Sequence, residues 1–176
     1  MAKATELIGK VPPHHLEAEQ SLLGALLIDK EAMNRIADIV TPDDFYRDAN
    51  RMVYEAIIDL YAKHEPLDVL SVANRLEEKK TIDMVGGRSY LASLASEVPT
   101  ASHIVHYAHI IQKKATLRKL QGAASDITAA VFGSDEDVET ILDTAERSIF
   151  QVSHRLIKRV FIPLKDALIA AFDRID

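Results

Sequence analysis

The chain has 176 residues, a formal net charge of −6 and 48% hydrophobic residues, which is enough apolar material for a globular core. It contains no cysteine, so disulfides, thiolate chemistry and cysteine-based zinc sites are excluded. No apolar run approaches the ~20 residues that a membrane span needs, and the N-terminus lacks the apolar centre of a signal peptide. We therefore expect a cytoplasmic protein with no membrane partner.

The first third of the chain predicts short helices separated by turns. Residues 1–13 are expected to form a flexible arm, and a helix is predicted over 16–28 with Gly24 inside it. Such a glycine costs ~1 kcal/mol relative to alanine unless close packing requires it. Asp29 is suited to cap a second helix that runs to about Val40. The following "TPDDFY" predicts a turn with an aromatic anchor.

Three more helices are predicted before residue 100. Asp48 is suited to cap a helix that ends near Lys63, and Asp68 is suited to cap "VLSVANRLEEKK". Gly86 and Gly87 predict a turn, because glycine tolerates positive φ angles. The segment "RSYLASLASEV" then predicts a short helix that stops before a proline. The sequence therefore indicates five compact helices in about the first 100 residues.

The pattern changes after Ser102, where a long helix is predicted to run to Phe132 with Gly122 as its one interruption. Apolar residues recur along it at spacings of three, four and seven: Ile110, Leu117, Leu120, Ala124, Ile127 and Val131. The segment "FGSDED" predicts a junction between helices, in which Ser134 with Asp137 resembles a capping box.

A second long helix is predicted from this junction to about Leu156. Its apolar stripe keeps a 4-3-4-3-4 spacing through Val138, Leu142, Ala145, Ile149, Val152 and Leu156. Two such helices joined by a short turn form a long antiparallel hairpin. The two stripes can pair with each other, and their length leaves room for a second molecule.

The last segment, "RVFIPLKDALIAAFDRID", predicts an amphipathic helix with Leu164, Leu168, Phe172 and Ile175 on one face. Its apolar face requires either the chain's own core or a partner outside this chain. The predicted fold class is therefore all-α: a compact helical bundle, a long antiparallel helical hairpin and a C-terminal linker helix. The expected divisions are an arm at 1–13, the bundle at 14–100, the hairpin at 101–156 and the linker with its helix at 157–176.

A search for chemistry finds no catalytic motif. The phosphate-binding pattern G-x-x-x-x-G-K-[ST] and the patterns G-x-G-x-x-G, G-x-S-x-G and H-E-x-x-H are absent, which argues against an enzyme. His103, His106 and His109 recur every three residues, but no acidic residue lies within that turn to complete a metal site. We predict no catalytic, cofactor or metal residue in this chain.

A basic cluster on the first long helix comprises Lys113, Lys114, Arg118 and Lys119. Two interpretations remain open at this point: a solvated helix face, or a face that contacts phosphate or an acidic protein. No aromatic residues are interleaved with the cluster, which disfavours a stacking platform for single-stranded nucleic acid.

Several motifs in order resemble the N-terminal domain of the DnaB family of bacterial replicative DNA helicases. The segment "VPPHHLEAEQSLLGALLID" is similar to the start of that domain, and "DDFY" and "VGGRSYLASL" fit patterns further along. "VPTASHIVHYAHII" followed by "KATLRKL" resembles the start of the family's helical hairpin. The resemblance extends over about residues 11–155. His15, His64 and His103 depart from it, and the stretch from 155 to 160 is less recognisable.

The resemblance implies a ring-organising role. Hairpins of that family pair between subunits, the dimers form a collar on the hexameric helicase, and the collar recruits primase. On this basis we expect Tyr90, Leu120 and Ile127 to be contact candidates for primase or for the paired hairpin. The closing helix is expected to anchor on the neighbouring subunit's motor domain through Leu164, Leu168 and Phe172.

The resemblance also implies that a RecA-like motor domain is absent from this chain, which we expect to be a fragment ending after the linker helix. ATP and Mg are expected only for that motor, which would also make the main contacts with DNA during unwinding at the fork. Expected partners are other copies of the chain, primase, the neighbouring motor and a helicase loader. Two alternatives stay open: a free-standing primosome or helicase-loading adaptor, and a weak nucleic-acid-binding module that uses Lys113 to Lys119.

Overall fold

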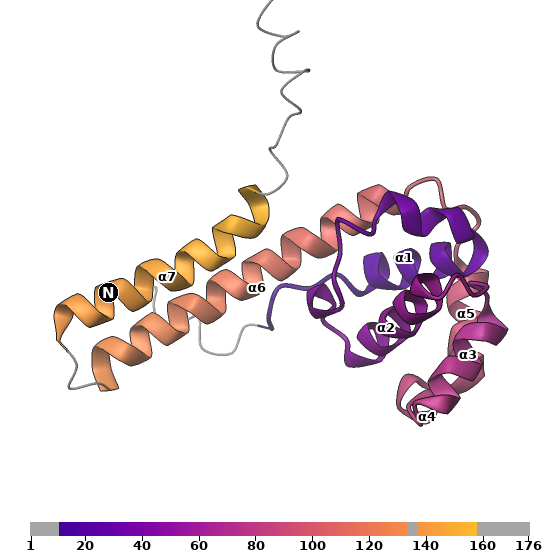
Figure 1. The fold of residues 1–176 in the computed structure, drawn as a ribbon, viewed down its shortest axis with the longest axis horizontal. Helices are drawn as coiled ribbons and strands as arrows, with labels where there is room; N and C mark the ends of the chain where they lie inside the picture. Colours follow the sequence, from indigo (N-terminus) through magenta and orange to yellow (C-terminus); the bar gives the residue numbers. More distant parts are fainter. Residues whose placement is uncertain (1–10, 134–136, 158–176) are drawn as a thin grey trace, which may run out of the picture. The chain divides into compact units, whose positions relative to one another are not determined.

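The computed structural model describes residues 11–133 and 137–157, with side chains up to Ser153. All the secondary structure in these ranges is helical, which confirms the predicted all-α class (Figure 1). In chain order the elements are α1 (Leu16–Ile28), the 3₁₀ segments η2 (Lys30–Arg35) and η3 (Pro42–Asp44), α2 (Asp48–Ala62), α3 (Val69–Glu78), α4 (Ile82–Val85), α5 (Gly87–Glu97), α6 (Ile104–Gly133) and α7 (Val138–Ile157).

The contacts of the chain divide it into two units, one ending at Arg118 and the other beginning at Lys119. We call the first the bundle unit and the second the hairpin unit. The division falls inside α6, whereas the sequence placed the boundary at about residue 100. The reason is that Ile104, Ala108 and Ile111 of α6 are buried in the same core as α1, α2, α3 and α5.

The core of the bundle unit lies between α1, α2 and α5. Helix α1 packs against α2 and α5, and α2 packs against α3 and α4. The largest side chains without solvent exposure come from every main helix of the unit: Leu22, Leu23, Leu26, Tyr54, Ile57, Leu76, Leu91, Leu94 and Ile104. Because each buried side chain of this size contributes about 1.5–3 kcal/mol, this core dominates the stability of the unit.

Gly24 marks the closest approach between two helices of the bundle. A Cβ atom added there would lie 2.1 Å from the Leu94 carbonyl oxygen and 2.8 Å from Cγ2 of Val98. Both neighbours belong to the end of α5 or the residue after it, and a backbone oxygen cannot move aside as a side-chain tip can. Close helix packing is therefore the reason for a glycine inside α1.

The helix predicted from Lys30 to Val40 was wrong. The chain forms the 3₁₀ segment η2 and then turns, and Ile36 leaves helical geometry with φ −129°. Hydrogen bonds link Ile36 N to the Met33 oxygen and Ile39 N to the Ile36 oxygen, which are three-residue closures. These tighter turns bury Met33, Ile36 and Val40 in the core, so tertiary packing overrides the α-helical pattern.

Helix starts were predicted with mixed success. The Asp68 carboxylate accepts a hydrogen bond from Ser71 N at 2.8 Å, as expected for a cap. Asp48 does not cap α2, because it is already the first helical residue and Arg47 occupies the cap position without a side-chain hydrogen bond. Gly86 and Gly87 adopt φ 108° and 73°, which confirms the predicted turn. The sequence did not predict the one-turn helix α4 before them.

The start of α7 also differs from the expected capping box. Asp137 itself caps the helix, with its carboxylate accepting a hydrogen bond from Thr140 N at 2.8 Å, and α7 begins at Val138. Ser134, the expected cap, lies outside the described residues. Hydrogen bonds from the Thr140 side chain and backbone hold the pKa of Asp137 below its usual value.

Gly24 and Gly122 both lie inside helices, and replacing each by alanine is predicted to have opposite effects on stability. Gly24→Ala forces a methyl group against the Leu94 carbonyl and is expected to lower the free energy of unfolding by about 3 kcal/mol. Gly122→Ala meets no atom within 4 Å and is expected to raise it by about 0.5–1 kcal/mol. Urea unfolding followed by far-ultraviolet circular dichroism measures both, and a shift of the same sign in the two variants would contradict this packing analysis.

Candidate functional site

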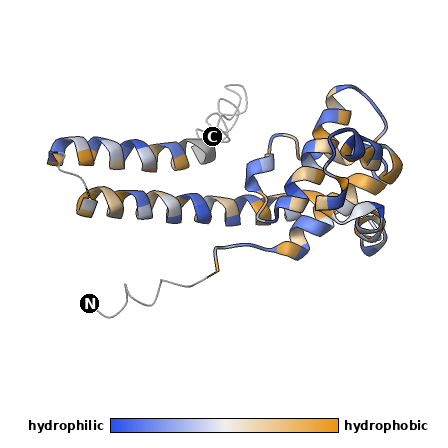
Figure 2. Cartoon of the chain, turned by 90° about the horizontal axis from the view of Figure 1, so that it is seen from below, coloured by the Kyte–Doolittle hydropathy of each residue, from blue (hydrophilic) through white to orange (hydrophobic). Residues whose placement is uncertain are grey.

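The described part of the hairpin unit comprises the second half of α6 and α7, which lie side by side (Figures 1 and 2). The partly or fully buried residues recur every three or four positions on both helices: Ala123, Ile127 and Ala130 on α6, and Ile141, Ala145, Ser148 and Val152 on α7. This spacing places them on one face of each helix, which is the seam between the helices. Ile127, expected to contact a partner, thus lies in the seam.

A second set of apolar residues in the hairpin unit faces solvent. Exposed fractions are 72% for Val138, 57% for Leu142 and 51% for Ile149 on α7, and Leu120 and Val131 on α6 are also exposed. We call these five residues the exposed hairpin face. The stripe predicted for α7 therefore splits, because the seam uses Ile141 and Ser148, which the sequence pattern did not include. Figure 2 shows apolar residues recurring among hydrophilic ones along both helices.

Helical spacing is what makes the exposed hairpin face a candidate site. Val138, Leu142 and Ile149 are separated by four and seven residues, and Leu120 and Val131 by eleven, so each set runs along its own helix. Exposed apolar residues scattered singly need no explanation, but rows of them mark interaction surfaces. An apolar row of this spacing accepts another helix by knobs-into-holes packing. The face is suited to binding a helical partner, and carries no groups for catalysis.

Phe132 and Phe150 add to the exposed apolar surface of the hairpin unit. Phe132 has 87% of its surface exposed and lies at the end of α6, next to the junction with α7. The sequence analysis missed both phenylalanines, because neither follows the heptad spacing. Large aromatic residues near the end of a predicted long helix could have indicated this surface from the sequence, since aromatic side chains contribute much of the binding energy of many interfaces.

Tyr90 belongs to the bundle unit, on α5, whereas Leu120 and Ile127 belong to the hairpin unit. Its hydroxyl donates a hydrogen bond to Oδ1 of Asn50 at 2.5 Å, and the Arg47 guanidinium lies 5.1 Å from the centre of its ring. Its side chain is therefore engaged with residues at the start of α2. The three expected contact residues therefore belong to two different units.

Arg118 is turned toward the bundle and away from the expected basic surface. Its guanidinium donates hydrogen bonds to the carbonyl oxygens of Pro13 at 2.8 Å and Asp44 at 2.6 Å, and it lies 5.7 Å from the centre of the Tyr46 ring. Among the other members of the cluster, Lys113 is exposed, while Lys114 and Lys119 are partly buried. Arginine suits this position because its planar fork can bind two oxygens at once.

The contacts of Arg118 gather two of the sequence motifs into one place. The His14 ring stacks on Tyr46 with centroids 4.4 Å apart and 16° between planes. The His14 ring also contacts the Pro12 carbonyl oxygen through Nδ1 at 2.8 Å. The segment "VPPH" and the segment "DDFY" are thus held against each other beside α6, although they are far apart in the sequence.

Glu19 is a buried carboxylate, with 2% of its surface exposed, at the N-terminus of α2. Its oxygens accept hydrogen bonds from Tyr46 N at 2.7 Å, Asn50 Nδ2 at 2.8 Å and Arg47 N at 3.4 Å. The two backbone N–H groups belong to residues that precede Asp48, the first residue of α2, so the carboxylate lies just before the helix, where the helix dipole favours negative charge. Glu19, which lies on α1, therefore anchors the chain that enters α2.

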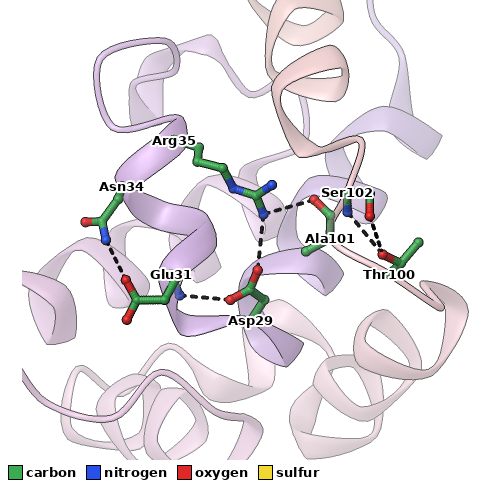
Figure 3. Close-up of polar contacts among 7 residues, drawn as sticks. All are labelled: Asp29, Glu31, Asn34, Arg35, Thr100, Ala101 and Ser102. Carbon is green, nitrogen blue, oxygen red and sulfur yellow. Dashed lines mark hydrogen bonds and ion pairs between the residues drawn. The ribbon is translucent and has the colours of Figure 1, made fainter.

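Arg35 ties η2 to the turn that precedes α6 (Figure 3). Its guanidinium donates to the Ala101 carbonyl oxygen and to the Asp29 carboxylate, both at 3.1 Å. A shallow pocket of about 600 Å³ adjoins it, lined also by Glu31, Asn34, Thr100 and Ser102. The polar groups of this lining bond mainly to each other, so they do not converge on a ligand, and we interpret the cluster as a structural tie.

The ionisable groups with shifted pKa values do not indicate catalysis. Burial raises the pKa of Tyr54 above its usual value, and the nearby Asp44 carboxylate adds to the effect. The Tyr54 hydroxyl donates to the Val40 carbonyl oxygen at 3.1 Å, so it acts as a neutral structural donor. The other shift belongs to the cap residue Asp137. Neither residue faces a partner that would make it an acid or a base.

Several expectations concern residues or groups beyond this site. Leu164, Leu168 and Phe172, the expected anchors of the linker helix, lie outside the described residues. In ranges 11–133 and 137–157, no three His, Asp or Glu side chains gather as a metal site would require. The ATP and Mg implied by the resemblance do not fit the residues present, since the sequence has no phosphate-binding loop. No helix in the described part combines the length and apolar character that crossing a bilayer requires.

Comparison with known proteins identifies the family. Residues 11–113, more than half of the chain, match the model of the DnaB-like helicase N terminal domain. The chain belongs to this family. It is 35% identical over 167 residues to the replicative DNA helicase DnaB of Geobacillus stearothermophilus, covering 95% of the chain and 37% of that protein. It is 37% identical over 174 residues to DnaB of Mycobacterium leprae, covering 98% of the chain and 29% of that protein.

Solved structures agree with this assignment. The N-terminal domain of DnaB helicase from Mycobacterium tuberculosis superposes with a TM-score of 0.78 at 38% identity, covering 80% of this chain and 99% of that one. A DnaB-like replicative helicase, described together with its interactions with primase, shares the fold at 21% identity and a TM-score of 0.68, covering 92% of this chain and 36% of that one. The resemblance inferred from the motifs is confirmed, and the chain spans a little over a third of the length of the Geobacillus relative.

Glu19→Gln is predicted to destabilise the bundle unit by about 2 kcal/mol, because an amide offers one acceptor oxygen where the carboxylate offers two. The new NH₂ group would also face the N–H donors of Tyr46 and Arg47, just before α2. The measurement is the midpoint of urea unfolding. Glu17→Gln, an exposed change of the same kind in the same helix, is the control and is expected to leave the midpoint unchanged. Equal midpoints for both variants would contradict the role assigned to Glu19.

Proposed function

We propose that this chain is the ring-organising and primase-recruiting N-terminal part of a replicative DNA helicase. In that protein a motor domain, not present in this sequence, would use ATP and Mg to unwind duplex DNA at the fork. Membership of the DnaB-like N-terminal family supports the proposal, as does the short span of the chain relative to its relatives. The exposed hairpin face carries the argument, because it is an interaction surface without catalytic groups.

The first partner we propose for the exposed hairpin face is a second copy of the chain. The seam already uses the inner stripes of α6 and α7, so Val138, Leu142 and Ile149 remain for a contact outside the hairpin unit. A pair of hairpins packed through such faces has the geometry of a four-helix bundle. Dimers of this kind would assemble into the ring.

The second partner we propose is primase. One solved structure with the same fold is described with its interactions with primase, and this chain shares the fold over 92% of its length. Leu120 is a contact candidate because it is exposed on the hairpin unit. Ile127 and Tyr90 are weaker candidates, since both are partly buried in contacts of their own. A helicase loader and the neighbouring motor remain further proposed partners.

A nucleic-acid-binding module is less well supported. Arg118 directs its guanidinium at two carbonyl groups of the bundle, which reduces the basic surface expected on α6. The family assignment also disfavours a free-standing adaptor with the same fold. We therefore place the main DNA contacts in the motor domain of the full-length protein.

Replacing two residues of the exposed hairpin face tests self-association. The double variant Leu142→Asp, Ile149→Asp places charges in an apolar interface and is expected to shift the chain to monomers, with unchanged helicity. Thr144→Asp adds a charge to an exposed position on the opposite side of α7 and is the control. Multi-angle light scattering over a range of concentrations gives the mass. A double variant that associates as strongly as the wild type would exclude this face as the self-contact.

A calorimetric titration with the C-terminal domain of primase from the same organism tests recruitment. We expect saturable binding at about one primase domain for two copies of the chain, with affinity reduced at least tenfold by Leu120→Asp. Lys113→Ala, an exposed change on the same helix, is the control. Absence of binding by a folded and assembled chain would refute primase recruitment and leave the ring-organising role intact.

A further inference from the structure

We propose that one face of α6 and one face of α7 form a second contact between copies of the chain, which joins dimers into a larger assembly. The exposed hairpin face cannot do this alone, because a contact between two identical faces is complete with two copies. The second contact pairs two different faces, so each dimer keeps free faces for the next one. This inference rests on the proposed self-association and names the surfaces by which the dimers associate further.

The outer face of α6 in the bundle unit carries hydrogen-bond donors. His106, His109 and Lys113 are exposed there. The side of the helix that enters the core is marked by buried residues at spacings of three and four: Ile104, Ala108, Ile111 and Ala115. Each of the three exposed residues precedes a core residue by two positions, and two positions correspond to about 200° around a helix. They therefore lie opposite the core, and we call them the donor row.

The donor row has no carboxylate near it in the sequence. Between Glu97 and Asp126 the chain contains no acidic residue. Among the described residues, Lys113 makes no ion pair. Lysine carries a positive charge, and a histidine ring offers at least one N–H donor whether it is neutral or protonated. The donor row is therefore suited to a partner that presents carboxylate groups at helical spacing.

Helix α7 presents such groups on its own outer face. Glu139, Asp143 and Glu146 are exposed, and we call them the acid row. Each of them precedes a residue of the seam by two positions, so the acid row faces away from the α6 helix of its own hairpin unit. Among the described residues, the ion pair made by this row joins Asp143 to Arg147. Glu139 and Glu146 have no such partner there and remain for another copy.

The spacings of the two rows match when the helices are antiparallel. Along α6 the donor row has gaps of three and then four residues, whereas along α7 the acid row has gaps of four and then three. An antiparallel arrangement reverses one of these orders and produces three facing pairs: His106 with Glu146, His109 with Asp143, and Lys113 with Glu139. A parallel arrangement displaces the middle pair by one residue, which is about 100° around the helix. Opposite chemistry in matching register makes a second copy of this chain the partner that fits.

Charge reversal tests the second contact. The acid-reversed variant Glu139→Lys, Glu146→Lys and the donor-reversed variant His106→Glu, Lys113→Glu each give the two rows charges of the same sign. We expect each variant alone to stop at the dimer mass in multi-angle light scattering, at low salt and at a concentration where the wild type forms larger assemblies. Exposed ion pairs are individually weak and are screened by salt, so the wild type is also expected to fall to the dimer mass at high salt.

Mixing the two variants provides the rescue. An equimolar mixture brings opposite charges together between copies, and a single chain with all four substitutions does the same, so both are expected to recover the larger mass. The control, Glu97→Lys with Asp126→Lys, changes the net charge as much as the acid-reversed variant does, at exposed positions outside both rows, and is expected to assemble as the wild type does.

The outcomes separate this inference from the self-association on which it rests. Reversed variants that assemble as the wild type does, or a mixture that stays dimeric, would overturn the second contact. A wild type that never exceeds the dimer mass at low salt would overturn it as well and leave the dimer intact. A wild type that stays monomeric would refute the proposed self-association itself and the second contact with it.

Discussion

The carboxylate of Glu19 is the contact on which the layout of the bundle unit depends. It lies on α1 but accepts hydrogen bonds from the N–H groups of Tyr46 and Arg47, just before α2, and Asn50 links it onward to Tyr90 on α5. A buried charge is costly unless its hydrogen bonds are made, so these three helices have one arrangement in which the cost is offset. The contact at Gly24 fixes the distance between α1 and α5 in that same arrangement.

Two arginines extend this arrangement to α6, and both bind backbone carbonyl groups. Arg35 holds the turn before α6 through Ala101, and Arg118 holds the helix at its exit through Pro13 and Asp44. Charge-assisted hydrogen bonds of this kind are about twice as strong as neutral ones. The first half of α6 is therefore held to the bundle unit by hydrogen bonds both before its start and at Arg118. This explains why the boundary between the two units falls inside the helix.

The sequence predicted most of the fold because the bundle depends on local signals. The extent of α1, the cap at Asp68 and the turn at Gly86 follow from spacing, side-chain chemistry and backbone freedom, and each was found. The tight turns after Lys30 and the contact of Glu19 with the chain entering α2 were not, because both depend on residues distant in the sequence. The exposed hairpin face was found in part: the spacing of Val138, Leu142 and Ile149 was recognised, but periodicity alone cannot say which stripe faces the neighbouring helix. Nothing near Arg118 in the sequence predicted that its guanidinium binds carbonyl groups of the bundle unit. A basic residue close to three lysines has the pattern of a solvent-exposed helix face.

The two units differ in how far their apolar side chains are buried and their polar side chains are hydrogen-bonded within the unit. In the bundle unit most large apolar residues form one buried core, with Leu70 and Met84 among the exposed exceptions, and the key polar groups are hydrogen-bonded within the unit. In the hairpin unit, the exposed hairpin face remains open to solvent. This contrast is what the proposed ring assembly requires, because a ring needs domains that fold on their own and leave one surface for their neighbours.

Residue-resolved amide hydrogen exchange of the unmodified chain at a low and a high concentration tests this contrast most directly. We predict that amides of the described part of the hairpin unit gain protection as the concentration rises, while those of α1, α2 and α5 stay equally protected. Protection that rises equally in both units, or in neither, would contradict the view that the bundle is self-sufficient and that the hairpin is completed by a second copy.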